Sequence, residues 1–68
     1  MTIELNGTVV ELTEAATVAE AVLRTSGEPD RRGIAVAVDG EVVPRSAWDK
    51  TPLAEGQRVE VVGAMQGG

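Results

Sequence analysis

Polar and apolar side chains alternate at the start of the chain. Residues 2–5 show this period of two, and a second β-prone run over residues 8–12 follows Asn6-Gly7. Asn-Gly between two such runs is typical of a type I′ hairpin turn, because both central residues of that turn need a positive φ. We therefore expect two hairpin-connected strands that turn at Asn6-Gly7.

Helical spacing replaces this alternation after residue 16. Thr17-Val18-Ala19-Glu20 has the form of a capping box, in which the Thr17 hydroxyl accepts from the N–H of Glu20 and the Glu20 carboxylate reaches back. The apolar positions that follow form one stripe at helical spacing: Val18, Ala19, Ala21, Val22 and Leu23. Arg24 suits the helix dipole and Gly27 suits the position after the last turn. These features predict a helix over residues 18–26.

The next predicted strand, residues 34–38, carries large side chains on one face and alanines on the other. Polar residues 28–33 precede it as a loop. We expect the large set, Ile34, Val36 and Val38, to pack beneath the helix. Ala35 and Ala37 then leave a smooth strip on the open face, which is consistent with a docking surface and equally with an ordinary thin surface.

A second hairpin signal follows at Asp39-Gly40. It leads into a short strand over residues 41–43, which Pro44 ends because proline cannot donate to a β-ladder. This strand is therefore expected at an edge of the sheet.

One helical turn over residues 45–50, capped by Ser46, is compatible with the next stretch. It contains Trp48, the single tryptophan, either as a packing residue or as part of a partner surface. The last strand is predicted over residues 58–62. Its valines Val59 and Val61 share one face, and Glu60 and Val62 share the other.

The resulting order is strand, strand, helix, strand, strand, strand, which predicts an α+β architecture. With a right-handed connection through the helix, the final strand enters the middle of a mixed sheet next to the first strand. That arrangement is the β-grasp, or ubiquitin-like, fold with one main helix. We expect a β-grasp domain over residues 1–62 and a flexible C-terminal tail over residues 63–68.

Composition limits what such a domain does by itself. A chain of 68 residues is near the lower size limit for a domain that folds alone, and it has no room for a large pocket. It contains no cysteine, histidine, tyrosine or phenylalanine. Disulfides, a cysteine-ligated metal site and the usual histidine-dependent catalysis are therefore excluded. We expect no catalytic residue, no metal site and no enzyme activity of its own.

Charge and hydropathy narrow the choice of partners. Eleven acidic and six basic residues give a formal net charge of −5, and no Lys/Arg cluster offers a stripe for phosphates. Nucleic acid is therefore a poor partner. No apolar run reaches the roughly 20 residues of a membrane span, and the first residues lack the basic start of a signal peptide. The sequence thus predicts a cytoplasmic protein without a membrane partner.

The chain closes on Gly67-Gly68, and the carboxylate of Gly68 is approached past two residues without side chains. Glycine backbones adopt almost any φ and ψ, so such a tail can thread a narrow channel. We expect Met65, Gln66 and Gly67 to form the segment that threads such a channel and brings the Gly68 carboxylate into it. A chance flexible end would give the same two glycines.

A specific resemblance emerges from four stretches of the chain. They are Ala35-Val36-Ala37-Val38-Asp39-Gly40, then Val42-Val43-Pro44-Arg45 with Trp48 three residues on, then Leu53-Ala54-Glu55-Gly56 before Val59-Glu60-Val61-Val62, and finally Gly67-Gly68. Together they resemble the ThiS family, the ubiquitin-like sulfur carriers of thiamine-thiazole biosynthesis, over nearly the whole chain. Val-Pro-Arg-x-x-Trp is the most telling part, because other ubiquitin-like carriers generally lack it.

The resemblance implies a mechanism and a set of partners. A ThiF-type adenylyltransferase, related to ubiquitin-activating enzymes, would use Mg-ATP to adenylate the Gly68 carboxylate. A sulfur donor such as a cysteine desulfurase would then supply sulfur for a terminal thiocarboxylate, which a ThiG-type thiazole synthase consumes. Mg-ATP would belong to the partner, and no cofactor would be bound by the carrier.

Docking of these partners is expected on the body of the domain. The candidates are Ala35, Ala37, Val62, Arg45 and Trp48. Two alternatives remain open: the small sulfur-carrier subunit of molybdopterin synthase, and a ubiquitin-like module that binds or modifies proteins without carrying sulfur.

Overall fold

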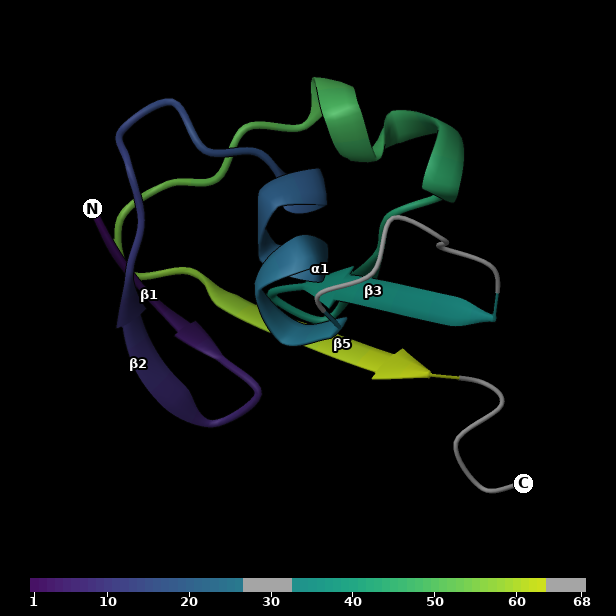
Figure 1. Cartoon of the computed structure of the whole chain (residues 1–68), viewed down its shortest axis with the longest axis horizontal. Coiled ribbons are helices and arrows are strands. Elements are labelled where there is room, and N and C mark those ends of the chain that lie inside the picture. The colour runs from purple at the N-terminus through teal and green to yellow at the C-terminus, as the bar shows by residue number, and fades with distance from the viewer. Residues whose placement is uncertain (27–32, 64–68) are drawn as a thin grey trace.

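The computed structural model describes residues 1–26 and 33–63 (Figure 1). Its elements are β1 Thr2–Leu5, β2 Thr8–Glu11, α1 Val18–Ser26, β3 Ile34–Val38, β4 Glu41–Val42, the 3-10 helix η1 Arg45–Lys50, and β5 Arg58–Gly63. The predicted loop at residues 28–32, the helix-terminating role of Gly27 and the tail residues Met65, Gln66, Gly67 and Gly68 lie outside the described part.

The five strands form one mixed sheet in the order β2-β1-β5-β3-β4. β5 is parallel to β1 on one side and antiparallel to β3 on the other. α1 lies across one face of this sheet, and η1 lies at the end of α1 (Figure 1). The last strand therefore occupies the centre of the sheet, as the β-grasp prediction requires, and that prediction is confirmed.

Both predicted hairpin turns are present. Asn6 and Gly7 have φ values of 51° and 83°, and Asp39 and Gly40 have φ values of 50° and 86°. Left-handed conformations at both central positions are the property that makes Asn-Gly and Asp-Gly the preferred residues here. The helix also begins and ends where its apolar spacing predicted, at Val18 and Ser26.

The core lies between α1 and the sheet, and its side chains follow the predicted alternation. Val36 is buried, while Ile34 and Val38 are half-buried against the core. Val59 and Val61 are buried in the same layer. The largest fully buried side chains of the described part are Trp48, Ile3, Val18, Val22, Val36 and Val59. The inward face of β5 thus anchors the central strand to the helix.

The predicted capping box at the start of α1 is wrong in its chemistry. The N–H of Glu20 donates to the backbone carbonyl of Thr17 at 3.0 Å, not to its hydroxyl. Thr17 is held instead in an isolated β-bridge with Pro52, with Val18 N–H donating to the carbonyl of Thr51 at 3.0 Å. A tertiary contact therefore fixes this helix start, and the local sequence motif could not reveal it.

One helix cap and two strand boundaries also differ from the sequence-based expectation. η1 begins at Arg45 with Pro44 at the cap position and without a side-chain cap, so Ser46 is not the cap. β4 ends at Val42 rather than Val43. β5 continues to Gly63, which pairs with Ile34 of β3, so the first residue assigned to the tail belongs to the strand.

None of the helices in residues 1–26 and 33–63 is both long and apolar enough to span a bilayer.

Candidate functional site

The candidate site begins at the C-terminal end of β5, from which the chain continues to Gly68. β5 lies between β1 and β3 and ends at Gly63, five residues before Gly68. Five residues extend at most about 18 Å. Chain length therefore limits the distance between Gly68 and the end of the central strand to about 18 Å, and a partner that contacts the sheet can reach both.

Asn6 fixes β5 on the side of β1. Its backbone N–H donates to the carbonyl of Val59 at 2.9 Å. Its side-chain amide then continues the ladder, because Nδ2 donates to the carbonyl of Val61 at 3.1 Å and Oδ1 accepts from the N–H of Val61 at 2.8 Å. One turn residue thereby supplies the pairing that β1 can no longer provide.

Asp39 does the same on the side of β3. Its N–H donates to the carbonyl of Arg58 at 2.7 Å, and its Oδ1 accepts from the N–H of Arg58 at 2.9 Å. The two turn residues therefore hold β5 from both sides, with Asp39 at its first residue and Asn6 further along the strand. Sequence analysis identified both residues as turn formers and missed this second role, because it depends on which strands are neighbours.

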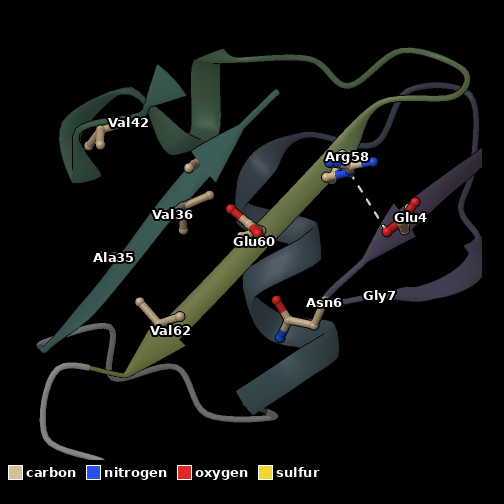
Figure 2. Close-up of a pocket in the computed structure, with 10 residues that line it drawn as sticks. Glu4, Asn6, Gly7, Ala35, Val36, Val42, Arg58, Glu60 and Val62 are labelled. Atoms are coloured by element: carbon tan, nitrogen blue, oxygen red, sulfur yellow. Dashed lines mark ion pairs between the residues drawn. The ribbon is translucent and has the colours of Figure 1, made fainter. Parts of the chain in front are cut away.

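The face of the sheet opposite α1 carries a hollow of about 610 Å³ (Figure 2). We call it the open-face hollow; it is lined by Glu4, Asn6, Gly7, Ala35, Val36, Ala37, Val42, Arg58, Glu60 and Val62. Three predicted docking residues, Ala35, Ala37 and Val62, lie together in it, because Ala35 pairs with Val62 across β3 and β5. Their role in docking stays a prediction.

Sequence analysis missed one apolar member of this surface. Val42 of β4 pairs with Ala37 and is 76% exposed, which makes it the most exposed large apolar residue of the described part. Together with Val62, 59% exposed, it borders the two alanines. The hairpin signal and Pro44 already placed Val42 in an edge strand, but only the register with Ala37 shows that it faces the hollow.

The open-face hollow also has a charged side, formed by residues of β1 and β5. Arg58 Nε lies 3.7 Å from Glu4 Oε2, an ion pair that connects β5 with β1 (Figure 2). A second hollow of about 440 Å³ adjoins it and shares Glu4, Arg58 and Glu60 with it, adding Asp39. Three carboxylates and one guanidinium thus line this second hollow, so this side of the surface is acidic.

Trp48 is not available for docking, which corrects its place among the candidates. Its side chain is 1% exposed, and Nε1 donates to the carbonyl of Val43 at 2.9 Å. The ring packs in the core, since η1 lies against α1 and buries it there. Arg45, at the start of the same 3-10 helix, is exposed and does not line the open-face hollow.

The described residues form an apolar surface with an acidic edge. Within residues 1–26 and 33–63, no three Asp or Glu side chains come together to hold a metal ion. What the geometry provides is a rigid central strand beside an apolar, acidic-edged surface.

These features define a class: a small β-grasp domain whose central strand leads to a Gly-Gly terminus. The ThiS family model matches residues 3–68, so the chain belongs to the ThiS family, the small sulfur carriers of thiamine biosynthesis. Its structure is similar to the crystal structure of the thiamine biosynthesis protein ThiS from Geobacter metallireducens, with a TM-score of 0.76 and 30% identity over 100% of both chains. A search of curated proteins found no match.

Proposed function

We propose that this protein carries sulfur as a thiocarboxylate on Gly68 and donates it to thiazole formation in thiamine biosynthesis. The observation that supports this most strongly is the match to the ThiS family through Gly68, combined with a central strand that leads to that residue. Because the chain has no cysteine, its terminal carboxylate is the natural place for covalently held sulfur.

The proposed chemistry begins with activation of a poor electrophile. A carboxylate oxygen of Gly68 attacks the α-phosphorus of Mg-ATP in the active site of a ThiF-type adenylyltransferase, and pyrophosphate leaves. The outer sulfur of a persulfide on a donor such as a cysteine desulfurase then attacks the acyl carbon, and AMP leaves. A thiol reduces the resulting acyl disulfide, which breaks its S–S bond and forms a new disulfide on the donor side. The product is a thiocarboxylate, whose sulfur is the nucleophile for a ThiG-type thiazole synthase.

In this proposal the protein body presents the terminus and the partners perform the catalysis. Asn6 and Asp39 hold β5 in place, so the chain leaves the sheet from a fixed point at Gly63. The open-face hollow beside it gives a partner a surface to hold while the last five residues enter its active site. Docking at Ala35, Ala37 and Val62 would hold the terminus near the enzyme's active site, so that its activation becomes effectively unimolecular.

Intact-mass measurement tests the proposal. The protein is incubated with Mg-ATP, the adenylyltransferase from the same organism and a sulfur source. We expect the intact chain to show the mass change of one sulfur replacing one oxygen. That change should disappear when thiazole synthase and the other substrates of this enzyme are added. An isopeptide-linked product would indicate a modifier, and a thiocarboxylate that thiazole synthase leaves untouched would contradict the thiamine assignment.

A further inference from the structure

The open-face hollow contains one carboxylate that the protein does not neutralise. Glu60 lies on β5 opposite Ala37 of β3, and its side chain is exposed beside Val62 (Figure 2). Within the described part of the chain it forms no ion pair, whereas Glu4 is paired with Arg58. A negative charge therefore stands at the boundary between the apolar and the charged side of the hollow.

Nothing else in the described part accounts for this charge. Glu60 has no structural contact that a carboxylate is needed for, since its backbone pairs with β3 whatever its side chain. The guanidinium of Arg58, which lines the same hollow, is already paired with Glu4. The described carboxylates do not converge on a metal position.

We propose that the open-face hollow docks the adenylyltransferase through an apolar patch that carries an arginine or lysine, and that this basic group pairs with Glu60. The inference rests on the proposed function, because it takes the adenylyltransferase as the partner. Apolar side chains of the enzyme cover Ala35, Ala37 and Val62, while its basic group reaches the adjoining acidic edge.

The physical reason is desolvation. A protein surface that covers the apolar part of the hollow also removes water from Glu60, which borders that part opposite Ala37. Removing water from an unpaired carboxylate is strongly unfavourable, and a hydrogen-bonded cation compensates for it. The exposed valines Val42 and Val62 favour contact with an apolar surface, but Glu60 restricts that contact to surfaces that supply a positive charge.

Charge complementarity distinguishes this occupant from others. In a twofold dimer of the chain through this surface, the same patch would face itself and bring Glu60 towards its own copy. Nucleic acids and anionic lipid surfaces carry the same sign of charge as the acidic edge. A basic, partly apolar protein surface is the occupant that satisfies both halves of the hollow.

Binding of three variants to the cognate adenylyltransferase tests the pairing. Glu60→Gln keeps the size of the side chain and removes its charge, and Glu60→Leu adds apolar surface as well. Glu20→Gln is the matched control, because Glu20 is exposed on α1 and its substitution changes the net charge equally. Kd is measured by titration calorimetry at two salt concentrations, and ATP–pyrophosphate exchange is followed on the same samples.

We expect both Glu60 variants to raise Kd by about tenfold or more, since a desolvated charge pair is lost. Their binding should also depend less on salt, while Glu20→Gln stays close to the original chain. Melting curves should be unchanged for the Glu60 variants. Tighter binding of Glu60→Leu would overturn the inference, since it would mean that the enzyme offers apolar surface without a cation. Equal weakening by Glu20→Gln would overturn it as well, in favour of long-range charge alone.

The two readouts separate this inference from the proposed function. If the original chain supports exchange and the Glu60 variants bind equally well, the pairing is wrong and the carrier function stands. If the original chain binds, the Glu60 variants bind weakly and no chain supports exchange, the pairing stands and the proposed function fails. If the original chain neither binds nor supports exchange, both fail.

Discussion

The side-chain amide of Asn6 pairs with both backbone polar groups of Val61, donating to its carbonyl at 3.1 Å and accepting from its N–H at 2.8 Å. Backbone pairing between β1 and β5 ends at Leu5 and Val59. The amide therefore continues the ladder by one step after the chain has turned away at Gly7. This contact stabilises the stretch of β5 that leads to the C-terminus.

Asn6→Gly tests that contact. Glycine keeps the left-handed turn but leaves the N–H and C=O of Val61 without their partners, so we expect a loss of about 1–3 kcal/mol in the free energy of unfolding. Asp39→Gly is the matched control, since it removes one exposed side-chain hydrogen bond in the same turn type and should cost less. Urea denaturation measures both, and an Asn6→Gly chain as stable as the original would contradict this account.

These two turn residues show how far the sequence alone can lead. Their dipeptides predict the positive φ values, because that requirement is local. Their pairing with β5 depends on strand order, which brings Asn6 to Val61 across more than fifty positions of the chain. The turn conformations were therefore predictable from the sequence, whereas the side-chain hydrogen bonds of these residues with β5 were not.

The candidate site divides in the same way. Alternation along β3 and β5 correctly assigned Ala35, Ala37 and Val62 to one face of the sheet. The pattern around Trp48 did not decide between core and surface, because a single large aromatic residue in a short turn suits either. Trp48 lies in the core because η1 packs against α1. Tertiary information was also needed for Val42, because only the register between β3 and β4 places it in the hollow.

Trp48→Phe should affect stability without affecting docking. Phenylalanine retains most of the buried ring, but it loses the Nε1 donor to the carbonyl of Val43 and leaves a small void. We expect a destabilisation of about 1–3 kcal/mol. Circular dichroism during urea denaturation is the suitable readout, because Trp48 is the only tryptophan. Weaker binding to the adenylyltransferase by a fully folded variant would return Trp48 to the docking surface.

Thr17→Ala should have little effect on stability. The contacts at the start of α1 use backbone atoms of Thr17, and alanine keeps them all. The expected change in the free energy of unfolding is within about 0.5 kcal/mol. Thermal denaturation measures this change. A loss of about 1 kcal/mol in the free energy of unfolding, as on removal of an N-cap, would instead assign the hydroxyl a capping role.

Two exposed valines allow a matched test of the docking surface. Val62 is 59% exposed and lines the open-face hollow, while Val9 is 69% exposed on β2 and does not line it. Serine at either position should leave the fold intact, because neither side chain is buried. We expect Val62→Ser to weaken binding to the adenylyltransferase by several-fold, as loss of an apolar contact does, and Val9→Ser to leave it unchanged. Equal effects from both would mean that the hollow is not the contact.

The central claim is that the terminal carboxylate of Gly68 is the reacting group. Adding one residue moves that carboxylate by up to about 3.6 Å, well outside the roughly 0.5 Å within which a catalytic geometry is held. Gly67→Ala keeps the carboxylate in place and adds one methyl group, which also restricts positive φ. It should slow activation without the complete loss expected of the extension.

ATP–pyrophosphate exchange with the cognate adenylyltransferase is the most direct measurement of this claim. The original chain, Gly67→Ala and a chain extended by one residue after Gly68 are compared at equal concentration, with the melting curve of each recorded. The account predicts full exchange for the original chain, reduced exchange for Gly67→Ala and none for the extended chain. Full exchange by a folded, extended chain would contradict it, since the Gly68 carboxylate would then not be the group that is activated.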